Sequence, residues 1–492
     1  MTGEQRESTP GSLRDRVRSA VFWRSGSQII AQLIAWTATF LVIRMLEPAD
    51  YGLFAMAALV VVFLALFEGY GFASSLIQRE SVSGLEVRQV FGLLLLLSAT
   101  LATAQLLLAP FAAAYFRQPE VAHILRVQAL LHLTTPFIAL PFALLSRELE
   151  YRKQAIASLA GSIAGAVTAL VLALQGFGVW TLVYAPIAMS VVRAVGMTYA
   201  ARSLIWPSFS FKGASAMIGF GGAMTVTQIF WFVQSQSDVF IGGRMLNAHM
   251  LGLYTTALFL TQILVAKFVP PLNDVAFATY SRMARAGTPI APAFAGAVRM
   301  IMLAALPFYL GLAVTAEPLV TAILGEQWLE TIPLVRLLAF AMPFMTLQIL
   351  FAPATNSLGR PGIAVRVNIY GAMIMATGFL IGVRYGVVGM AGVWLVGFPL
   401  LTALTATMSL PLIGLSAAAL GRAIAPGLLA ATFMAGLVAL LDAMLPELSG
   451  LSRLALLVAS GITSYSAWLL IFARPLVFEL WNFVAKRESA IA

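Results

Sequence analysis

Apolar stretches of about twenty residues recur along the whole chain, and short polar connections separate them. A stretch of that length crosses the ~30 Å hydrocarbon core of a bilayer as an α-helix. Such stretches lie near 20–43, 52–75, 89–113, 123–145, 154–174, 178–200, 214–238, 250–275, 293–315, 332–355, 362–383, 388–411, 422–442 and 453–473. Helices satisfy their own backbone hydrogen bonds in lipid, so we predict an all-α polytopic membrane protein with about fourteen transmembrane helices.

The composition agrees with this class, because only 10% of the residues are charged, against about 25% in soluble proteins. A transmembrane β-barrel would show weak alternation in place of long continuous runs. The connections leave no room for a soluble catalytic domain. No cleavable signal peptide is visible, so we expect the first apolar stretch to remain as the first membrane helix.

Cations alternate from one connection to the next, which predicts the orientation of the chain. The N-terminus is basic, and so is every second connection: Arg79 and Arg88; Arg147, Arg152 and Lys153; Arg202 and Lys212; Arg282 and Arg285; Arg360 and Arg366; Arg422. The positive-inside rule therefore places both termini in the cytoplasm. The same rule accounts for the net charge of +10, so we predict no nucleic-acid partner.

The chain also repeats itself. Arg44-Met45-Leu46, Gly52-Leu53-Phe54 and Ala57 return some two hundred residues later as Arg244-Met245-Leu246, Gly252-Leu253-Tyr254 and Ala257. Two further matches follow in order: Arg126 and Ala129 with Arg336 and Ala339, and Gly178-Val179-Trp180 with Gly392-Val393-Trp394. Spans 1–6 and 7–12 are therefore two copies of one six-helix unit. Because six is an even number, both copies have the same topology in the membrane and form a parallel pseudo-repeat, an arrangement typical of transporters.

The repeat and the charged tails predict the domain organisation. We expect a cytoplasmic N-terminal tail at 1–18, an N-terminal lobe of six helices at 19–203 and a cytoplasmic linker at 204–213. A second lobe of six helices at 214–412, two further helices at 413–474 and a cytoplasmic C-terminal tail at 475–492 complete the chain.

Ionisable residues inside membrane spans are costly, and they indicate function by default. Four stand out: Arg24, Glu68, Asp238 and Lys267. We predict a water-filled cavity between the lobes, in which Arg24 and Lys267 hold an anionic group and Glu68 balances the charge or carries a proton. The alternative is structural, with Arg24 paired to Glu68, or Arg44 to Asp238, simply to hold helices together.

Polar residues in the spans extend the predicted cavity. Gln28 and Gln32 in the first span, Gln228 in the seventh and Arg193 in the sixth are candidate substrate contacts. Hydrogen bonding between helices is the competing interpretation for each. Arg44, Asp238 and Arg244 are candidates for gating or structural roles.

Small residues and prolines predict local packing. Gly161 and Gly165 form a GxxxG pattern, which is typical of closely packed membrane helices. The Pro270-Pro271 pair should bend the eighth span just past Lys267.

Signals for catalysis are missing from the sequence. There are no cysteines, and the three histidines, His123, His132 and His249, are too scattered to suggest a metal cluster. No P-loop, paired carboxylates or nucleophile–base arrangement is recognisable. We therefore predict no catalytic residue, no metal and no cofactor, and we do not expect an enzyme.

Several motifs resemble one known family. Leu46-Glu47-Pro48-Ala49-Asp50-Tyr51-Gly52 is similar to a signature of the polysaccharide transporters of the multidrug/oligosaccharidyl-lipid/polysaccharide exporter superfamily, which includes the Wzx-type oligosaccharide flippases. Glu68-Gly69-Tyr70-Gly71 followed by Leu76-Ile77-Gln78-Arg79 resembles a second segment of that family. Asp238, Ile241-Gly242 and the second copy of the repeat resemble its counterpart in the other half.

The resemblance implies a two-lobed fold with a cationic central cavity and alternating access. It implies a substrate as well: an oligosaccharide on an undecaprenyl diphosphate carrier, moved across the bacterial inner membrane for exopolysaccharide, capsule or O-antigen synthesis. Membrane lipids, and a polysaccharide polymerase with export machinery, are the partners that it implies. Arg24 and Lys267 would then face the diphosphate or acidic sugars.

Two other functions remain open. An ion-coupled multidrug antiporter of the same superfamily would need a cavity dominated by acids. A membrane polymerase or ligase of glycans would need a sizeable external loop with reactive groups, and this chain has only short connections.

Overall fold

A computed structural model describes residues 10–68, 76, 82–210, 215–445 and 450–476, without the side chains of 10–25, 27 and 215–228. Regular structure in these ranges is helical throughout. Eleven stretches of the described chain are long and apolar enough to cross a membrane, and three of them contain more than one helix: Pro119–Arg147, Glu326–Ser357 and Gly362–Ile413. The prediction of an all-α polytopic membrane protein is confirmed.

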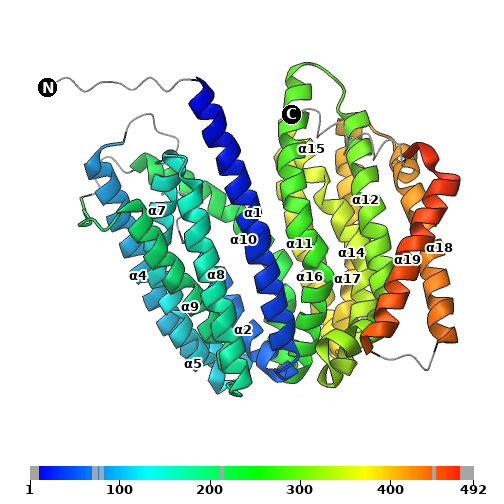
Figure 1. The fold of residues 1–492 in the computed structure, drawn as a ribbon, viewed down its shortest axis with the longest axis horizontal. Helices are drawn as coiled ribbons and strands as arrows, with labels where there is room; N and C mark the ends of the chain where they lie inside the picture. Colours follow the sequence, from blue (N-terminus) through cyan, green and yellow to red (C-terminus); the bar gives the residue numbers. More distant parts are fainter. Residues whose placement is uncertain (1–9, 69–75, 77–81, 211–214, 446–449, 477–492) are drawn as a thin grey trace. The chain divides into compact units, whose positions relative to one another are not determined.

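The chain forms two compact units, residues 1–229 and 230–492. The first unit contains α1 (Pro10–Ile43), α2 (Pro48–Ala65), α4 (Gly84–Phe116), α5 (Pro119–Gln128), α6 (Leu130–Thr134), α7 (Pro136–Arg147), α8 (Tyr151–Leu174) and α9 (Val179–Ala201). In this unit α8 packs along both α1 and α9, while α4 packs against α5 and α7 against α9 (Figure 1). The unit division falls inside α10 (Ser215–Met245).

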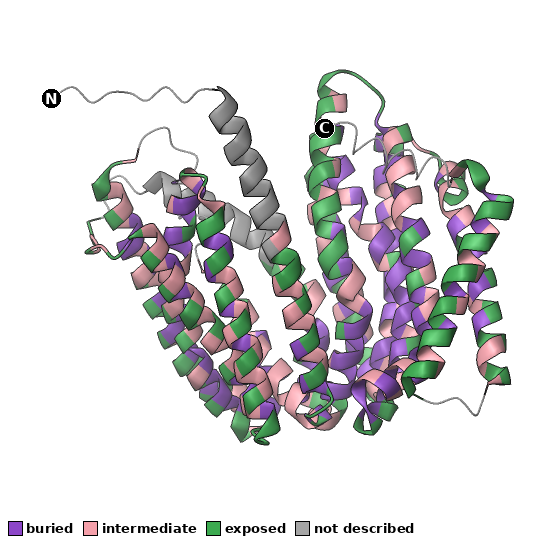
Figure 2. Ribbon diagram, in the orientation of Figure 1, coloured by how far each residue is buried: buried purple, intermediate pink, exposed green. Residues whose placement is uncertain are grey.

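The second unit continues with α11 (Ala248–Arg285), α12 (Ala291–Val314), α13 (Ala316–Leu319), α14 (Ile332–Ile349), α15 (Phe351–Ser357), α16 (Gly362–Gly382), α17 (Gly386–Ile413), α18 (Ala417–Met444) and α19 (Gly450–Phe472). Its core is formed by α14, which packs against α11, α12 and α17. Buried residues are concentrated there, whereas α18 and α19 pack beside α12 and expose most of their surface (Figure 2).

The sequence repeat is visible in the structure of both units. Glu47 and Asn247, which are equivalent in the repeat, are the N-caps of α2 and α11. The preceding turns also match, because Leu46 N donates to Val42 O at 3.0 Å and Leu246 N donates to Gly242 O at 2.8 Å. Residues 121–130 and 331–340 show the same order of buried and exposed positions at nine of ten places.

Three predicted spans are not continuous helices. One of them, predicted at 332–355, is divided at Leu350 into α14 and α15. The second span of the chain, predicted at 52–75, is helical only to Ala65, and Glu68 lies in a turn beyond the helix end. Bonds from Phe67 N to Leu64 O and from Glu68 N to Ala65 O tighten the chain there. The fourth span is divided into α5, α6 and α7. The break between α6 and α7 is at Thr135, directly before Pro136, which has no N–H to continue the helix.

The predicted linker 204–213 begins as part of the first unit. Its described residues are hydrogen-bonded to the start of α4: Ser208 N donates to Arg88 O at 2.9 Å, and Arg88 Nε donates to Trp206 O at 2.9 Å. Gln89 Nε2 donates to Ser210 O at 2.7 Å. These bonds hold the described part of the segment against α4.

Candidate functional site

A chain of polar side chains crosses the interior of the first unit, with His132 of α6 at its centre. His132 is fully buried, and both ring nitrogens have partners. Nδ1 lies 3.1 Å from Glu68 Oε1, and Nε2 lies 2.8 Å from Gln105 Oε1 of α4. Gln105 is also buried and donates from Nε2 to Leu125 O at 2.7 Å. Three separate elements thus meet at one imidazole.

The local fold explains how these groups come together. The breaks on either side of α6 form a separate five-residue helix, Leu130–Thr134, that carries His132. Leu125 belongs to the preceding α5, whose carbonyl accepts from Gln105. Glu68 reaches the ring because α2 ends at Ala65 and the chain then turns.

This arrangement is suited to holding or moving a proton. Histidine is the side chain whose charge ordinarily changes near neutral pH. The Glu68 side chain is 15% exposed, so it connects the closed imidazole to the outside of the unit. An ionisable pair in an apolar interior is typical of proton relays in membrane proteins.

A second buried polar chain lies in the second unit. Tyr254 of α11 donates from its hydroxyl to Asp238 Oδ2 at 3.0 Å, and Trp394 Nε1 of α17 donates to the same hydroxyl oxygen at 2.6 Å. Val239 N donates to Asp238 Oδ1 at 2.8 Å. Asp238 is only 3% exposed, and these bonds compensate for removing its carboxylate from water.

The first unit lacks this chain, because the repeat is not symmetric here. The residues equivalent to Asp238 and Tyr254 are Ala38 and Phe54, neither of which can hydrogen-bond through its side chain. The equivalent of Trp394 is Trp180, which stacks on Tyr184 with ring centroids 5.6 Å apart. Each unit therefore has its own buried polar centre at a different place.

Lys267 is the described candidate that most needs a ligand. It lies near the middle of α11 and is exposed, although its neighbours along the helix are apolar. In the described part of the chain, no carboxylate lies within ion-pair distance of Lys267. A cation in a membrane span needs water or an anionic partner, so Lys267 is a suitable place for an anionic ligand.

The other predicted cavity residues lie in varied surroundings. Gln28 is exposed on α1, whereas Gln32 is half-buried. Arg193 is half-buried on α9, and its Nε has no hydrogen-bond partner among the described residues. The side chains of Arg24 and Gln228 lie outside the described residues. The cavity between the lobes stays a prediction.

Two of the residues predicted to gate or to hold helices, Arg44 and Arg244, are at helix ends. Arg44 is exposed in the turn between α1 and α2, and Arg244 is half-buried in the last turn of α10. Asp238 bonds to Tyr254, and Glu68 lies against His132. The ion pairs weighed from the sequence, Arg44 with Asp238 and Arg24 with Glu68, stay predictions.

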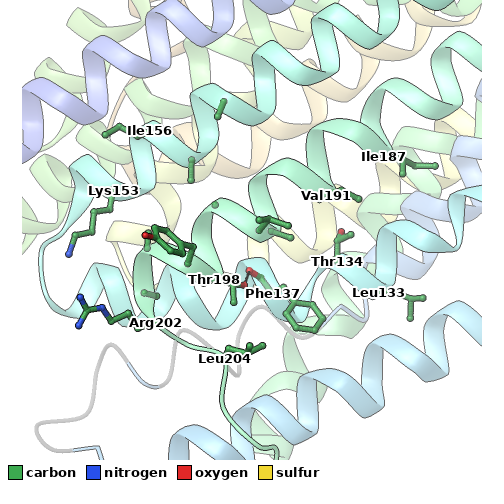
Figure 3. Close-up of a pocket in the computed structure, with 18 of the residues that line it drawn as sticks. Leu133, Thr134, Phe137, Lys153, Ile156, Ile187, Val191, Thr198, Arg202 and Leu204 are labelled. Atoms are coloured by element: carbon green, nitrogen blue, oxygen red, sulfur yellow. Dashed lines mark hydrogen bonds between the residues drawn. The ribbon is translucent and has the colours of Figure 1, made fainter.

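An apolar groove of about 1610 Å³ runs between α6, α7, α8 and α9 of the first unit. Figure 3 shows Lys153 and Arg202 at one end of the groove, and Leu133 and Ile187 toward the other. Glu148 also lines the groove, and Lys153 forms an exposed ion pair with Glu150 at 3.6 Å. The charged end of the groove therefore contains both cations and anions. Such a lining suits hydrocarbon chains, and we interpret the groove as a lipid contact rather than a sugar site.

Four of the buried polar residues were missed by the sequence analysis: His132, Gln105, Tyr254 and Trp394. His132 and Gln105 did carry a signal, since each is a polar residue inside an apolar stretch. Nothing in the sequence indicated that they share a site, because the bond between them joins two different spans. No set of three or more His, Cys, Asp or Glu in the described ranges could hold a metal ion.

The fold and these centres define a polytopic helical membrane protein, built as transporters are, with ionisable groups inside its spans. Residues 41–333 match the family described as "Polysaccharide biosynthesis protein". The match covers more than half of the sequence, and the chain belongs to this family. The resemblance drawn from the Leu46–Gly52 and Glu68–Arg79 segments is confirmed.

Individual proteins support this assignment. The chain is 28% identical to the succinoglycan biosynthesis transport protein ExoT of Rhizobium meliloti (strain 1021), over 70% of this chain and 69% of that protein. It is 22% identical to the lipopolysaccharide biosynthesis protein WzxC of Escherichia coli (strain K12), over 75% and 76%. The solved structure of the lipid II flippase MurJ in an inward closed conformation shares the fold, with a TM-score of 0.75 at 12% identity, covering 93% of this chain and all of that one.

Proposed function

We propose that this protein is a flippase of the bacterial inner membrane. It would move an undecaprenyl-diphosphate-linked oligosaccharide from the cytoplasmic to the external leaflet for exopolysaccharide, capsule or O-antigen synthesis. The observation that carries the proposal is the family match over residues 41–333, together with a relative named as a succinoglycan transport protein. In this proposal both termini are cytoplasmic, and the protein is a transporter rather than an enzyme.

The position of Lys267 supports a diphosphate ligand. An α-helix rises about 1.5 Å per residue, so Lys267 lies about 29 Å along α11 from Ala248. In the first unit the equivalent turn follows Ile43, the last residue of α1, and Arg24 lies about 29 Å along α1 from Ile43. If those turns are external, both cations are at the depth of the cytoplasmic headgroups, given a core of ~30 Å. A lipid diphosphate would enter the protein at that depth.

The cycle that we propose is alternating access between the two lobes. The headgroup binds to Lys267 and Arg24 from the cytoplasmic side while the lipid tail stays in the bilayer. Gln28, Gln32, Gln228 and Arg193 supply hydrogen bonds to the sugars. Polymerase and export machinery would take over the product outside. A two-copy architecture suits this cycle, because matched halves can move relative to each other around a fixed site.

Deletion of the gene tests the proposal directly. We expect undecaprenyl-linked repeat units to accumulate on the cytoplasmic side, with loss of mature polymer. Normal polymer with unchanged intermediates would overturn the flippase. A resistance defect with normal polymer would instead support the multidrug antiporter. Repeat units that reach the external leaflet and stay unpolymerised would support the polymerase or ligase.

Substitution of Lys267 tests the ligand. In the deletion strain we expect Lys267→Ala to restore polymer about 10-fold less well than the unaltered gene, and Lys267→Arg to restore most of it, since a tenfold loss corresponds to about 1.4 kcal/mol of binding. Arg285→Ala is the matched control, because Arg285 is an exposed cation in the last turn of the same helix. Full polymer with Lys267→Ala would remove this residue from the site.

A further inference from the structure

The hydrogen bonds around His132 determine where its protons are. A backbone carbonyl only accepts, so Gln105 must direct its Nε2 toward Leu125 O, at 2.7 Å. The amide oxygen of Gln105 then faces His132 Nε2 at 2.8 Å, and it can only accept. The opposite orientation of the amide would bring two oxygens together. His132 Nε2 therefore carries a hydrogen.

The other ring nitrogen also requires a proton. His132 Nδ1 lies 3.1 Å from Glu68 Oε1. If the imidazole were neutral and Glu68 ionised, two lone pairs would face each other, because the hydrogen of the neutral ring is already on Nε2. One further proton must lie between the two groups, bonded either to Nδ1 or to the carboxyl.

We infer that Glu68 and His132 together form a binding site for one exchangeable proton, with Gln105 orienting the ring. Binding is a simple addition, in which one proton from water joins the carboxylate and the neutral imidazole. Release returns that proton to water and leaves Nε2–H on the ring.

The surroundings isolate this pair. The helices packed against α6 are α4, α5, α7 and α9. Their titratable and charged residues are Glu86, Arg88, Tyr115, Glu120, His123, Arg126, Arg147, Tyr184, Arg193 and Tyr199. In the described part of the chain none of them forms a hydrogen bond or ion pair with His132. Glu68 is the partly exposed member, at 15%, so the proton enters and leaves through its carboxyl group.

Proton release has a structural consequence. The Glu68–His132 contact holds the turn after α2 to α6, and through Gln105 to α4. Without the proton, the facing lone pairs repel and favour a conformation in which Glu68 leaves the ring. A proton gradient could thereby shift the balance of two conformations of the lobe. This coupling step rests on the proposed flippase function, whereas the proton site itself does not.

Nitrogen NMR of the purified protein labelled at histidine tests the proton site. The chain has three histidines, so His132→Gln identifies the signal of His132 and His123→Gln serves as the matched control. At neutral pH we expect Nε2 of His132 to be protonated and one further proton to be either on Nδ1 or on the Glu68 carboxyl, which carbon labelling of Glu68 reports. In Glu68→Gln the ring should lose the proton on Nδ1, because an amide can donate to that nitrogen. An unprotonated Nδ1 beside an ionised Glu68 carboxylate in the unaltered protein, or an unprotonated Nε2, would overturn the proposal, whether or not the variants fold.

Proteoliposomes carrying a labelled lipid-linked oligosaccharide test the coupling. We expect a proton gradient to change the rate of lipid movement in the unaltered protein and in His123→Gln, but not in Glu68→Gln or His132→Gln. Lipid movement that ignores the gradient in the unaltered protein would overturn the coupling. If the NMR result holds but the protein moves no lipid-linked oligosaccharide, the flippase proposal fails and the proton site stands.

Discussion

At the scale of single residues, the buried polar centre of the second unit shows how two residue differences can give one copy of a repeat a site that the other copy lacks. Tyr254 differs from its equivalent, Phe54, by one hydroxyl group, and Asp238 replaces Ala38. Together the two changes introduce a buried carboxylate and its donor in one unit only. A buried charge without a donor is costly, so each change depends on the other.

This dependence gives a prediction for Tyr254→Phe. The variant removes the donor to Asp238 and the acceptor of Trp394 Nε1, and it should lower the free energy of unfolding by about 1–3 kcal/mol. Thermal unfolding of the purified protein measures this. The double variant Asp238→Ala/Tyr254→Phe, which recreates the Ala38 and Phe54 pair, should lose less than the sum of the two single variants. Additive losses would show that the hydrogen bond does not couple them.

At the scale of helices, close approach of α8 and α9 depends on glycine. Gly161 and Gly165 are buried against α9, so the close packing predicted from the GxxxG pattern is confirmed. A Cβ on Gly161 would lie 2.8 Å from Met189 O and 3.1 Å from Arg193 Cβ. The nearer neighbour is backbone, which cannot rotate away as a side chain can.

Gly161→Ala should therefore force the two helices apart and destabilise the protein by about 1–3 kcal/mol. Gly436→Ala is the matched control, since Gly436 is inside α18 and a Cβ there meets nothing within 4 Å. The control should gain up to about 1 kcal/mol from the better helix propensity of alanine. Thermal unfolding of both variants decides the matter, and equal stability would contradict close packing at Gly161.

At the scale of the whole molecule, contacts within the second unit bring several predicted external connections to one end. His249 Nε2 lies 3.6 Å from Glu330 Oε1, which joins the turn before α11 to the segment before α14. Arg453 pairs with Asp442 at 2.7 Å and with Glu317 at 3.6 Å, which adds the connection between α18 and α19.

The side of the membrane can be tested by labelling. Because the chain contains no cysteine, single cysteines at Glu330 and Ala286 give unambiguous signals with a maleimide that cannot cross membranes. We expect Glu330→Cys to react in intact spheroplasts, and Ala286→Cys to react only after the membrane is opened. Both positions are exposed, so the labelling of each cysteine depends only on whether the maleimide reaches that side of the membrane. The reverse pattern would invert the orientation.

The membrane class, the helical segments and the repeat could all be predicted from the amino-acid sequence, because these depend on hydrophobicity and on spacing along the chain. It also indicated Glu68, Asp238 and Lys267, since a charge in an apolar stretch is conspicuous without any structure. It did not indicate that α2 ends at Ala65 or that α6 is a separate helix, because hydropathy is continuous across both breaks.

The partners of these charged residues became known from the three-dimensional structure. Glu68, Gln105 and His132 belong to three apolar segments of the first unit, and Asp238, Tyr254 and Trp394 belong to three helices of the second. A hydrogen bond depends on distances of about 3 Å between atoms far apart in the chain, and a sequence pattern reports only the spacing along it. The hydrophobicity of the sequence therefore predicts the class of this protein, while its proposed proton site is formed by contacts between helices.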